Sequence, residues 1–480
     1  MKKTPEQKRE KEIARLTREK NKPKFPGYLI YFVMIITVIY IADEVATQIG
    51  TQMQSVIASQ IFAPVVGKDV AVARMSAIST VSMLFSVVAF IYKPLSDRYG
   101  RRVFLVVNTL GMGVGLTFIS LATNIPVYLL GAAFIAFFIP HDMQAVYIQE
   151  CAPAKHRGKM YFIIKSLSTV GMLLIPLLRK AFIPSTDLSG WRFVYIIPAC
   201  VAFISAVIAL FCIRESDVFI DNRLNYLTGE HTADKNKDAQ IQGSLLNGIK
   251  FVFRHRQLRV LYIAGGFLMF GMLITSYYES IMTYGFAQQF VAAGLDIESA
   301  KLEANAYVTQ ALMLFSIGSA IFQMLPSLTI DRLGRKPTAI FTCCTMLVAY
   351  LAFYFGSGNG IAPSIVGFCC GAAVGSYWAN GDIIGLMAAE SAPTNLRVSV
   401  TTSYSIISGV IYAVAMLTVM ILANILGDAK IGLVCLVTIV PGMTLGLVLL
   451  CLKVKETKGM DLTNVDTQAL DAPQEQTVNS

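Results

Sequence analysis

Five acidic side chains lie within long apolar stretches of this chain, and they are the residues best placed to do chemistry: Asp43, Glu44, Asp142, Glu279 and Asp382. They form spaced pairs, because Asp142 and Asp382 are 240 residues apart and Glu44 and Glu279 are 235 apart. An ionisable group inside a membrane is costly and usually faces a water-filled route. Burial favours the neutral form of a carboxyl group, so acids along such a route can take up protons, attract cations or do both.

Each of these acids also has a structural explanation. Glu279 could lie close enough to the outer surface to be solvated, and Asp142 and Asp382 could be held by hydrogen bonds alone. Asp43 and Glu44 are adjacent and therefore cannot share a helix face. We expect one of them to line the route and the other to be capped or exposed.

Three polar or aromatic residues accompany the acids, since Tyr278, Trp378 and Asn380 lie just before two of them. The rings could stack on a sugar or shelter a cation, although aromatic residues near a membrane interface often only anchor a span. Lys165 is the one basic residue in the interior of an apolar stretch. It could neutralise an acid or bind an anionic group of a solute.

Two charged cassettes, 234 residues apart, lie in very short loops between apolar stretches: Asp97-Arg98-Tyr99-Gly100-Arg101-Arg102 and Asp331-Arg332-Leu333-Gly334-Arg335-Lys336. A second duplicated pair, 240 residues apart, consists of Glu150 with Arg157 and Glu390 with Arg397. The glycine of each cassette can supply the positive φ that a tight turn needs. An isolated cassette could merely orient its flanking helices, but the duplication predicts two halves with the same chemistry at the same membrane edge.

The elements that carry these residues are predicted to cross a membrane. Of the 480 residues, 55% are hydrophobic and 15% are charged, which leaves too little polar surface to cover a soluble globule. Apolar runs long enough for a hydrocarbon core of roughly 30 Å must be helices, because lipid cannot satisfy backbone polar groups. Twelve spans are predicted, at residues 28–47, 73–92, 103–121, 125–147, 160–178, 193–213, 260–286, 304–325, 337–355, 364–387, 400–422 and 431–452.

The basic residues predict the orientation of these spans. With both termini in the cytoplasm, 32 of the 40 Lys and Arg residues fall in cytoplasmic segments, seven fall outside or at the outer edge of a span, and Lys165 lies within a span. The net charge of +10 is thus spread over short loops that face anionic lipid, and nucleic-acid binding is not expected. The nine cysteines show neither a disulfide framework nor metal-ligand spacing, so no metal or cofactor is expected.

The predicted fold is all-α, with twelve transmembrane helices in two pseudo-symmetric six-helix bundles. Residues 1–26 form a basic cytoplasmic tail that could contain a short surface helix, and residues 27–214 form the first bundle. Residues 215–257 form a cytoplasmic linker, residues 258–453 form the second bundle, and residues 454–480 form a cytoplasmic tail. No small-residue cleavage site precedes the first span, which argues against a cleaved signal peptide.

With four further motifs, the cassettes resemble the major facilitator superfamily, and within it the sugar porter family and its organic-ion relatives. The motifs are residues 147–158, Gly190-Trp191-Arg192, Arg214-Glu215-Ser216 and Lys455-Glu456-Thr457-Lys458-Gly459. Six markers in register make the resemblance specific, and it covers residues 28–462. It implies the major facilitator fold and transport by alternating access.

The resemblance also implies a gate at the cytoplasmic ends of the spans, where acids pair with arginines when the inner side is closed. The predicted gate residues are Asp97, Glu150, Asp331 and Glu390, with Arg98, Arg101, Arg157, Arg332, Arg335 and Arg397. Such ion pairs are weak one at a time but together bias a two-state rocking motion. In sugar porters the first span carries a proton-coupling carboxylate, which favours Glu44 while Asp43 remains an alternative.

Other positions depart from the sugar porter pattern. Lys165 lies where sugar porters usually carry a sugar-binding Gln, and residues 275–280 stand where a paired-Gln motif is usual. Leu130, Gly131 and Ala132 occupy the region of a coupling-linked Arg. The resemblance is therefore stronger for the scaffold than for a sugar as the solute.

We predict a secondary transporter, not an enzyme, that moves one small polar or charged organic solute by alternating access and is coupled to protons. Its predicted solute pathway comprises Asp142, Lys165, Tyr278, Glu279, Trp378, Asn380 and Asp382, and proton coupling is assigned to Asp43 or Glu44. The sequence contains no phosphate-binding Gly-Lys loop of the kind that an ATP-driven pump needs. It also contains no nucleophile, base and orienting group at the spacing of a recognisable catalytic site.

Two alternatives stay open. A multidrug or organic-cation exporter is favoured by the acidic lining and disfavoured by loops of sugar porter type. A non-transporting nutrient sensor on the same fold would usually carry a long cytoplasmic tail. In each case the chain is expected in the plasma membrane as a monomer, with lipid, protons and a small solute as its partners.

Overall fold

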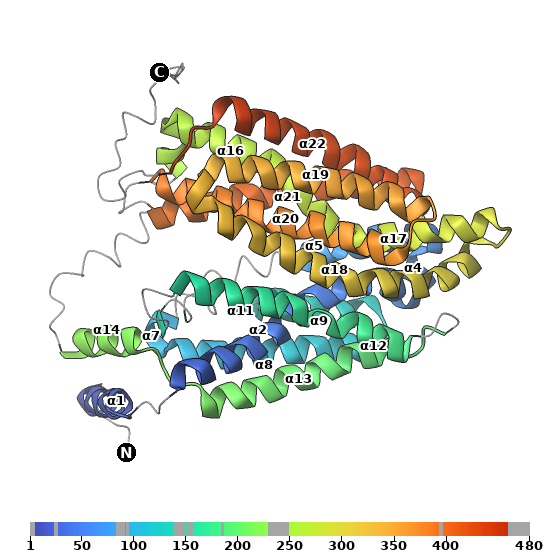
Figure 1. Cartoon of the computed structure of the whole chain (residues 1–480). Helices are drawn as coiled ribbons and strands as arrows, with labels where there is room; N and C mark the ends of the chain where they lie inside the picture. The colour runs from blue at the N-terminus through green and yellow to red at the C-terminus, as the bar shows by residue number, and fades with distance from the viewer. Residues whose placement is uncertain are drawn as a thin grey trace, which may run out of the picture. The chain divides into compact units, whose positions relative to one another are not determined.

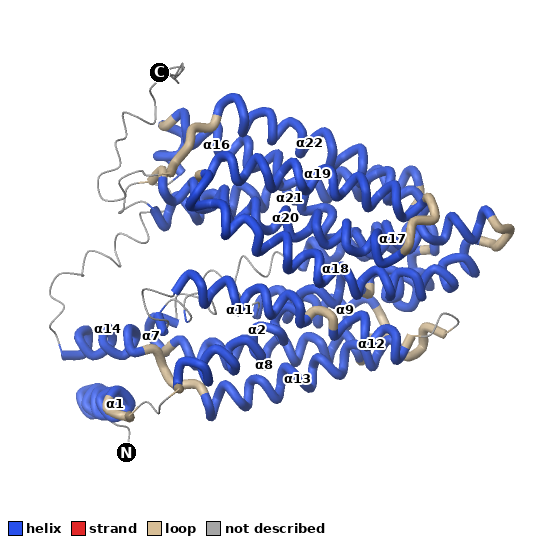
Figure 2. The backbone as a smooth tube through the Cα atoms, in the orientation of Figure 1, coloured by secondary structure: helices blue, strands red, loops and turns tan. Residues whose placement is uncertain are grey.

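The computed structural model describes residues 5–23, 27–82, 92, 96–138, 147, 150–151, 157–183, 187–228, 249–392 and 397–458, and within these ranges every regular element is a helix (Figures 1 and 2). Eight helical stretches in them are long and apolar enough to cross a membrane, judged by length and composition. Asp142 lies outside the described residues. Helices form here because each apolar run must satisfy its own backbone hydrogen bonds.

One compact unit comprises Met1–Gly50, Ile78–Ile183 and Leu188–Asn236. Its helix α8 packs along α9 and α13. Phe32 and Ile36 form a buried cluster with Leu105 and Tyr147. The helices with residues in this unit are α1 (Pro5–Lys20), α2 (Tyr28–Gln52), α5 (Ala71–Ser82), α7 (Ser96–Tyr99), α8 (Arg101–Ser120), α9 (Ile125–Phe138), α11 (Arg157–Gly171), α12 (Leu174–Phe182), α13 (Trp191–Cys212) and α14 (Asp217–Thr228).

The second compact unit comprises Thr51–Ala77, Pro184–Asp187 and Lys237–Ser480. It begins with α3 (Gln54–Ile57), the π-helical turn η1 (Ala58–Phe62), α4 (Ala63–Val66), η2 (Lys68–Val70) and the start of α5. Its longer helices are α16 (Arg256–Leu268), α17 (Met272–Ala292), α18 (Ile297–Leu333), α19 (Arg335–Gly358), α20 (Pro363–Glu390), α21 (Arg397–Leu426) and α22 (Ile431–Lys453). Two three-residue 3-10 turns lie between them, η4 (Met269–Gly271) before α17 and η5 (Asp428–Lys430) before α22. Residues 51–77 thus cluster with the C-terminal helices, although they fall within the bundle predicted at residues 27–214, whose boundaries stay a prediction.

In the second unit, α18 and α20 pack side by side, as Figure 1 shows. Gly367, Gly371 and Gly375 are spaced four residues apart and so share one face of α20. A Cβ atom at any of them would overlap backbone atoms of α18. Small residues at this spacing allow two membrane helices to pack backbone against backbone.

The N-terminal tail contains a docked helix. Leu16 of α1 is buried against Phe219 and Ile220 of α14. The side chain of Arg223 meets Glu12 with an Nε–Oε1 distance of 3.0 Å. Arg214 donates to the carbonyl oxygen of Glu19, in the last turn of α1 where helix carbonyls lack partners, and to that of Lys22 just beyond the helix. The tail is therefore attached to the segment that follows α13.

Candidate functional site

Both cassettes form the same turn, in which glycine directly precedes a helix. Gly100 precedes α8 with φ +111°, and Gly334 precedes α19 with φ +107°. With ψ near 150° to 170°, this backbone conformation is essentially restricted to glycine. The first N–H groups of each helix have no partner within the helix, and glycine has no side chain to cap them, so they need an outside acceptor.

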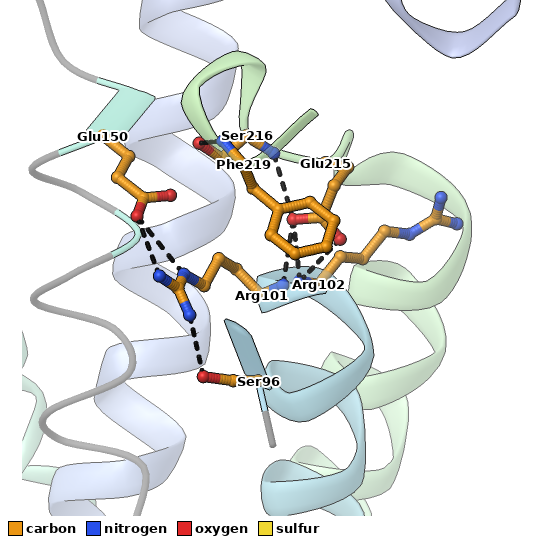
Figure 3. A network of polar contacts seen from close by, with 7 residues as sticks. All are labelled: Ser96, Arg101, Arg102, Glu150, Glu215, Ser216 and Phe219. Carbon is orange, nitrogen blue, oxygen red and sulfur yellow. Dashed lines mark hydrogen bonds and ion pairs between the residues drawn. The ribbon is translucent and has the colours of Figure 1, made fainter. Parts of the chain in front are cut away.

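Two glutamates supply that acceptor. In the N-terminal half, the N–H of Arg101 donates to Oε1 of Glu215 over 3.0 Å and the N–H of Arg102 donates to Oε2 over 3.2 Å (Figure 3). In the C-terminal half, the N–H groups of Arg335 and Lys336 donate to Oε1 and Oε2 of Glu456 over 2.9 and 3.0 Å. A carboxylate at a helix N-terminus is favoured by the helix dipole.

Arg101 and Arg335 each form an ion pair with a second glutamate. The distance from Nη2 of Arg101 to Oε1 of Glu150 is 3.2 Å, and the distance from Nη2 of Arg335 to Oε1 of Glu390 is 3.0 Å. The four side chains are only 11 to 17% exposed. Such pairs are stronger than exposed surface pairs, because less water screens them.

The surroundings of the two pairs differ. Arg101 donates to Oγ of Ser96 over 2.8 Å, as Figure 3 shows. In the other half, the hydroxyl of Thr457 donates to Oε2 of Glu390 over 2.6 Å. Oε2 of Glu150 is buried and has no hydrogen-bond partner among the described residues. The C-terminal pair is therefore the more completely bonded of the two.

Glu215 and Glu456 are site residues to which the sequence analysis assigned no role. They belong to the motifs Arg214-Glu215-Ser216 and Lys455-Glu456-Thr457, and their offset of 241 residues is one residue longer than the offset of Glu150 and Glu390. Burial raises the pKa of Glu215, while the backbone N–H groups of Ser216, Arg102 and Arg101 act in the opposite direction. The duplicated offset was the signal that could have identified them.

Among the predicted gate residues, the structure brings together Arg101 with Glu150 and Arg335 with Glu390. Arg332 is exposed, and its carbonyl oxygen accepts a hydrogen bond from Nζ of Lys458 over 2.9 Å. The other predicted gate side chains lie outside the described part of the structure: Asp97, Arg98, Arg157, Asp331 and Arg397. Their gate roles stay predictions.

The predicted coupling acids are buried, with Asp43 2% and Glu44 7% exposed on α2. Glu279 on α17 is 0% exposed and accepts the N–H of Ser55 over 2.8 Å. Asp382 on α20 is exposed. Of these four acids, Asp382 alone lies at the surface of the described structure.

The remaining predicted pathway residues also differ in their surroundings. Tyr278 is buried, and its ring stacks on Phe315 with a centroid distance of 4.5 Å. Asn380 is buried and donates to the carbonyl oxygen of Ala339 over 2.8 Å, which joins α20 to α19. Lys165 and Trp378 are half-buried. Tyr278 and Asn380 thus lie in helix contacts, and the pathway roles stay predictions.

Two further observations bear on possible ligands. Within the described ranges, no group of three or more His, Cys, Asp or Glu side chains is arranged to hold a metal ion. An open cavity of about 350 Å³ lies in the second unit, with Tyr284, Gln288, Tyr354 and Lys430 in its lining. None of the predicted pathway residues lines this cavity.

Alanine in place of Gly100 or Gly334 should destabilise the protein. The backbone conformation alone costs a residue with a Cβ about 1 to 3 kcal/mol. The added Cβ would also approach the Oε2 atoms of Glu215 or Glu456 and displace the helix cap. We expect a lower melting temperature of purified protein for both variants. Gly409→Ala is the control, because no described atom lies within 4 Å of its Cβ, and melting at the wild-type temperature in all three would refute the role of the turn.

Comparison with known proteins gives a family and several relatives that are named as transporters. The family model described as Major Facilitator Superfamily matches residues 25–416. The chain is 24% identical to solute carrier family 2, facilitated glucose transporter member 10, of Danio rerio over 267 residues, which cover 54% of this chain and 49% of the relative. It is 22% identical to the D-xylose-proton symporter of Escherichia coli strain K12 over 337 residues, which cover 63% of this chain and 66% of the symporter. The chain thus spans about half the length of the first relative and 66% of the second.

A solved structure extends the likeness to the fold. The crystal structure of a D-xylose-proton symporter matches 90% of this chain and 99% of its own chain, with a TM-score of 0.61 and 17% sequence identity. The predicted fold class, an all-α membrane protein of the major facilitator type, is confirmed.

Proposed function

Because this chain belongs to the major facilitator superfamily, we propose that it is a secondary transporter that moves one small polar or charged organic solute by alternating access. The relatives named above are transporters rather than enzymes, and the chain is an integral membrane protein. The observation that carries the proposal is the duplicated arrangement of a helix-capping glutamate beside an Arg–Glu pair. The same charged arrangement in both halves is suited to a transporter whose two halves rock against each other.

The mechanical role of this arrangement follows from the elements that it joins. In the C-terminal half, Arg335 begins α19, Glu390 ends α20, and Glu456 and Thr457 follow α22. The contacts therefore tie the ends of three helices together. We propose that each half moves as one body because of these ties, so that transport changes the contacts between halves rather than within them.

The proposed coupling of transport to protons rests on the acids of α2. Asp43 and Glu44 are carboxylates in a membrane-spanning helix and are almost fully buried. A carboxylate that alternates between buried and hydrated surroundings can bind a proton in one state and release it in the other. We propose that one of the two carries the proton.

Substitution of the coupling acid should abolish pH-driven accumulation of the solute. In proteoliposomes with an imposed pH gradient, either Asp43→Asn or Glu44→Gln is expected to lose accumulation while still exchanging solute across the membrane, because binding and rocking do not need the proton. Glu303→Gln is the control, since Glu303 is an exposed acid on α18. Full accumulation in both Asp43→Asn and Glu44→Gln would rule out this assignment.

For the solute itself, we propose contact with Lys165, Trp378 and Asp382, which are half-buried or exposed on membrane helices. Asp142, Tyr278, Glu279 and Asn380 stay candidates for the same pathway. A melting-temperature screen over sugars, organic acids and amines would identify the class, because a ligand that binds only the folded state raises stability. Stabilisation by acids alone would favour a site at Lys165.

An organic-cation exporter is the second candidate, and the acidic residues of the spans favour it. Stabilisation by amines alone in the same screen would select this alternative. For either solute, we propose that the chain lies in the plasma membrane with both termini in the cytoplasm. A nutrient sensor would bind a solute in the screen but would move none into proteoliposomes.

A further inference from the structure

The segment Thr51–Ala77 comes from the N-terminal half of the sequence but packs as part of the second compact unit. The residues that flank it on both sides belong to the first unit. The helical stretch that follows α2 begins at Gln54, and α5 begins at Ala71, directly after the 3-10 turn η2. The first N–H groups of a helix have no partner inside it, so each start needs an outside acceptor.

Glu279 supplies the acceptor at the first start. α2 ends at Gln52, and Met53 interrupts the helix with φ −116° and ψ 13°. The N–H of Ser55, in the first turn after this break, donates to Oε2 of Glu279 over 2.8 Å. Glu279 lies on α17 with its side chain 0% exposed. The cap is therefore shielded from water.

Asp428 supplies the acceptor at the second start, the beginning of α5. The N–H of Val72 donates to Oδ2 of Asp428 over 2.7 Å, and the N–H of Ala73 donates to Oδ1 over 3.1 Å. Asp428 is the first residue of η5, in the short turn between α21 and α22, and is 1% exposed. One carboxylate thus binds two successive N–H groups of α5.

Hydrogen bonds between side chains also join the segment to α17. The hydroxyl of Ser280 donates to Oε1 of Gln54 over 2.7 Å, and Nε2 of Gln54 donates to Oγ of Ser76 over 2.7 Å. Oγ of Ser55 lies 3.3 Å from Oγ of Ser280. Gln54, Ser76 and Ser280 are buried. The segment is therefore joined to α17 by hydrogen bonds between side chains as well as by the cap.

We propose that Glu279 and Asp428 form an outer latch, which holds residues 51–77 against the C-terminal helices and must release before the solute pathway opens to the outside. The inference rests on the proposed alternating access and on the proposed orientation, which puts the end of α2 outside. A helix N-terminus carries about half a positive charge, so each buried carboxylate is held by charge as well as by hydrogen bonds. Once the contact opens, water can form hydrogen bonds with both the freed N–H groups and the freed carboxylates. The latch is therefore reversible.

Cysteine accessibility tests the latch without any knowledge of the solute. Val72 is 3% exposed, so Val72→Cys, in a chain whose nine native cysteines are replaced, should react slowly with a membrane-impermeant maleimide added outside. Adding Glu279→Gln with Asp428→Asn should raise the labelling rate about tenfold, because both charge–dipole contacts are lost. Asp428→Asn alone keeps one acceptor oxygen and should give a smaller increase. Asp69→Asn removes an exposed acid whose charge repels that of Asp428, so it should not raise the labelling rate.

Unchanged labelling in folded Asp428→Asn, or an equal increase in Asp69→Asn, would overturn the proposal. Should the double variant fail to fold, a cross-link offers a second measurement that keeps both acids. Ser55→Cys with Ser280→Cys should form a disulfide on oxidation that blocks transport, and a reductant should restore it. Full transport by cross-linked protein would also overturn the latch. If the reduced double-cysteine protein showed no transport, this result would count against the proposed function. It would leave the latch untouched, because the labelling of Val72→Cys reports on the latch without transport.

Discussion

Gly371→Ala is expected to leave little folded, transport-competent protein. A Cβ at position 371 would overlap the carbonyl oxygen of Phe315 and lie 2.8 Å from the backbone nitrogen of Ser319. Both atoms belong to the backbone of α18, which cannot turn aside as a side chain could. Overpacking in a core typically costs about 1 to 3 kcal/mol, and we expect the upper end of that range because α18 and α20 must separate along their length.

The measurement is the yield of monodisperse protein in detergent together with its melting temperature. Gly385→Ala is the matched control on the same helix, because no described atom lies within 4 Å of its Cβ. Alanine is also the better helix former by about 1 kcal/mol, so this control should melt at or above the wild-type temperature. Equal melting of Gly371→Ala and Gly385→Ala would show that α20 does not pack on α18 in this way.

Glu390→Ala should produce the largest effect at the helix ends that carry the two cassettes. It removes the partner of Arg335 and of the Thr457 hydroxyl, and truncating one member of a buried, hydrogen-bonded ion pair costs about 2 to 5 kcal/mol. Glu150→Ala should cost less, because Glu150 has a single described partner, Arg101. Melting temperature reports the effect on stability.

A double-mutant cycle separates the ion pair from other consequences of the substitution. Arg335→Ala combined with Glu390→Ala should cost less than the two single changes added together, because neither charge is then left without its partner. Thr457→Val removes only one hydrogen bond and should cost about 1 kcal/mol. Strict additivity of Arg335→Ala and Glu390→Ala would mean that the pair contributes nothing to holding the helix ends together.

The helical architecture could be predicted from sequence because each span needs only its own apolar length to form. The duplicated offsets of 234 and 240 residues also predicted which charged residues recur in the second half of the chain. Among these residues, the structure pairs Arg101 with Glu150 and Arg335 with Glu390. Arg335 begins α19 and Glu390 ends α20, so the two side chains meet because consecutive helices run antiparallel from the short loop at their opposite ends.

Other contacts depend on tertiary packing, because side chains far apart in sequence meet only after helices have rotated and approached. Glu279 was predicted on a pathway from its depth in a span, yet only the fold shows that it meets Ser55. The same holds for Asp428 at the start of α5 and for Glu215 at the start of α8. The spacing of Gly367, Gly371 and Gly375 can be read from the sequence. Only the structure shows that α18 is the helix whose backbone packs against this face of α20. Hydropathy and loop length act locally and so determine spans and repeats, whereas the partner of a buried polar group is determined by the packing around it.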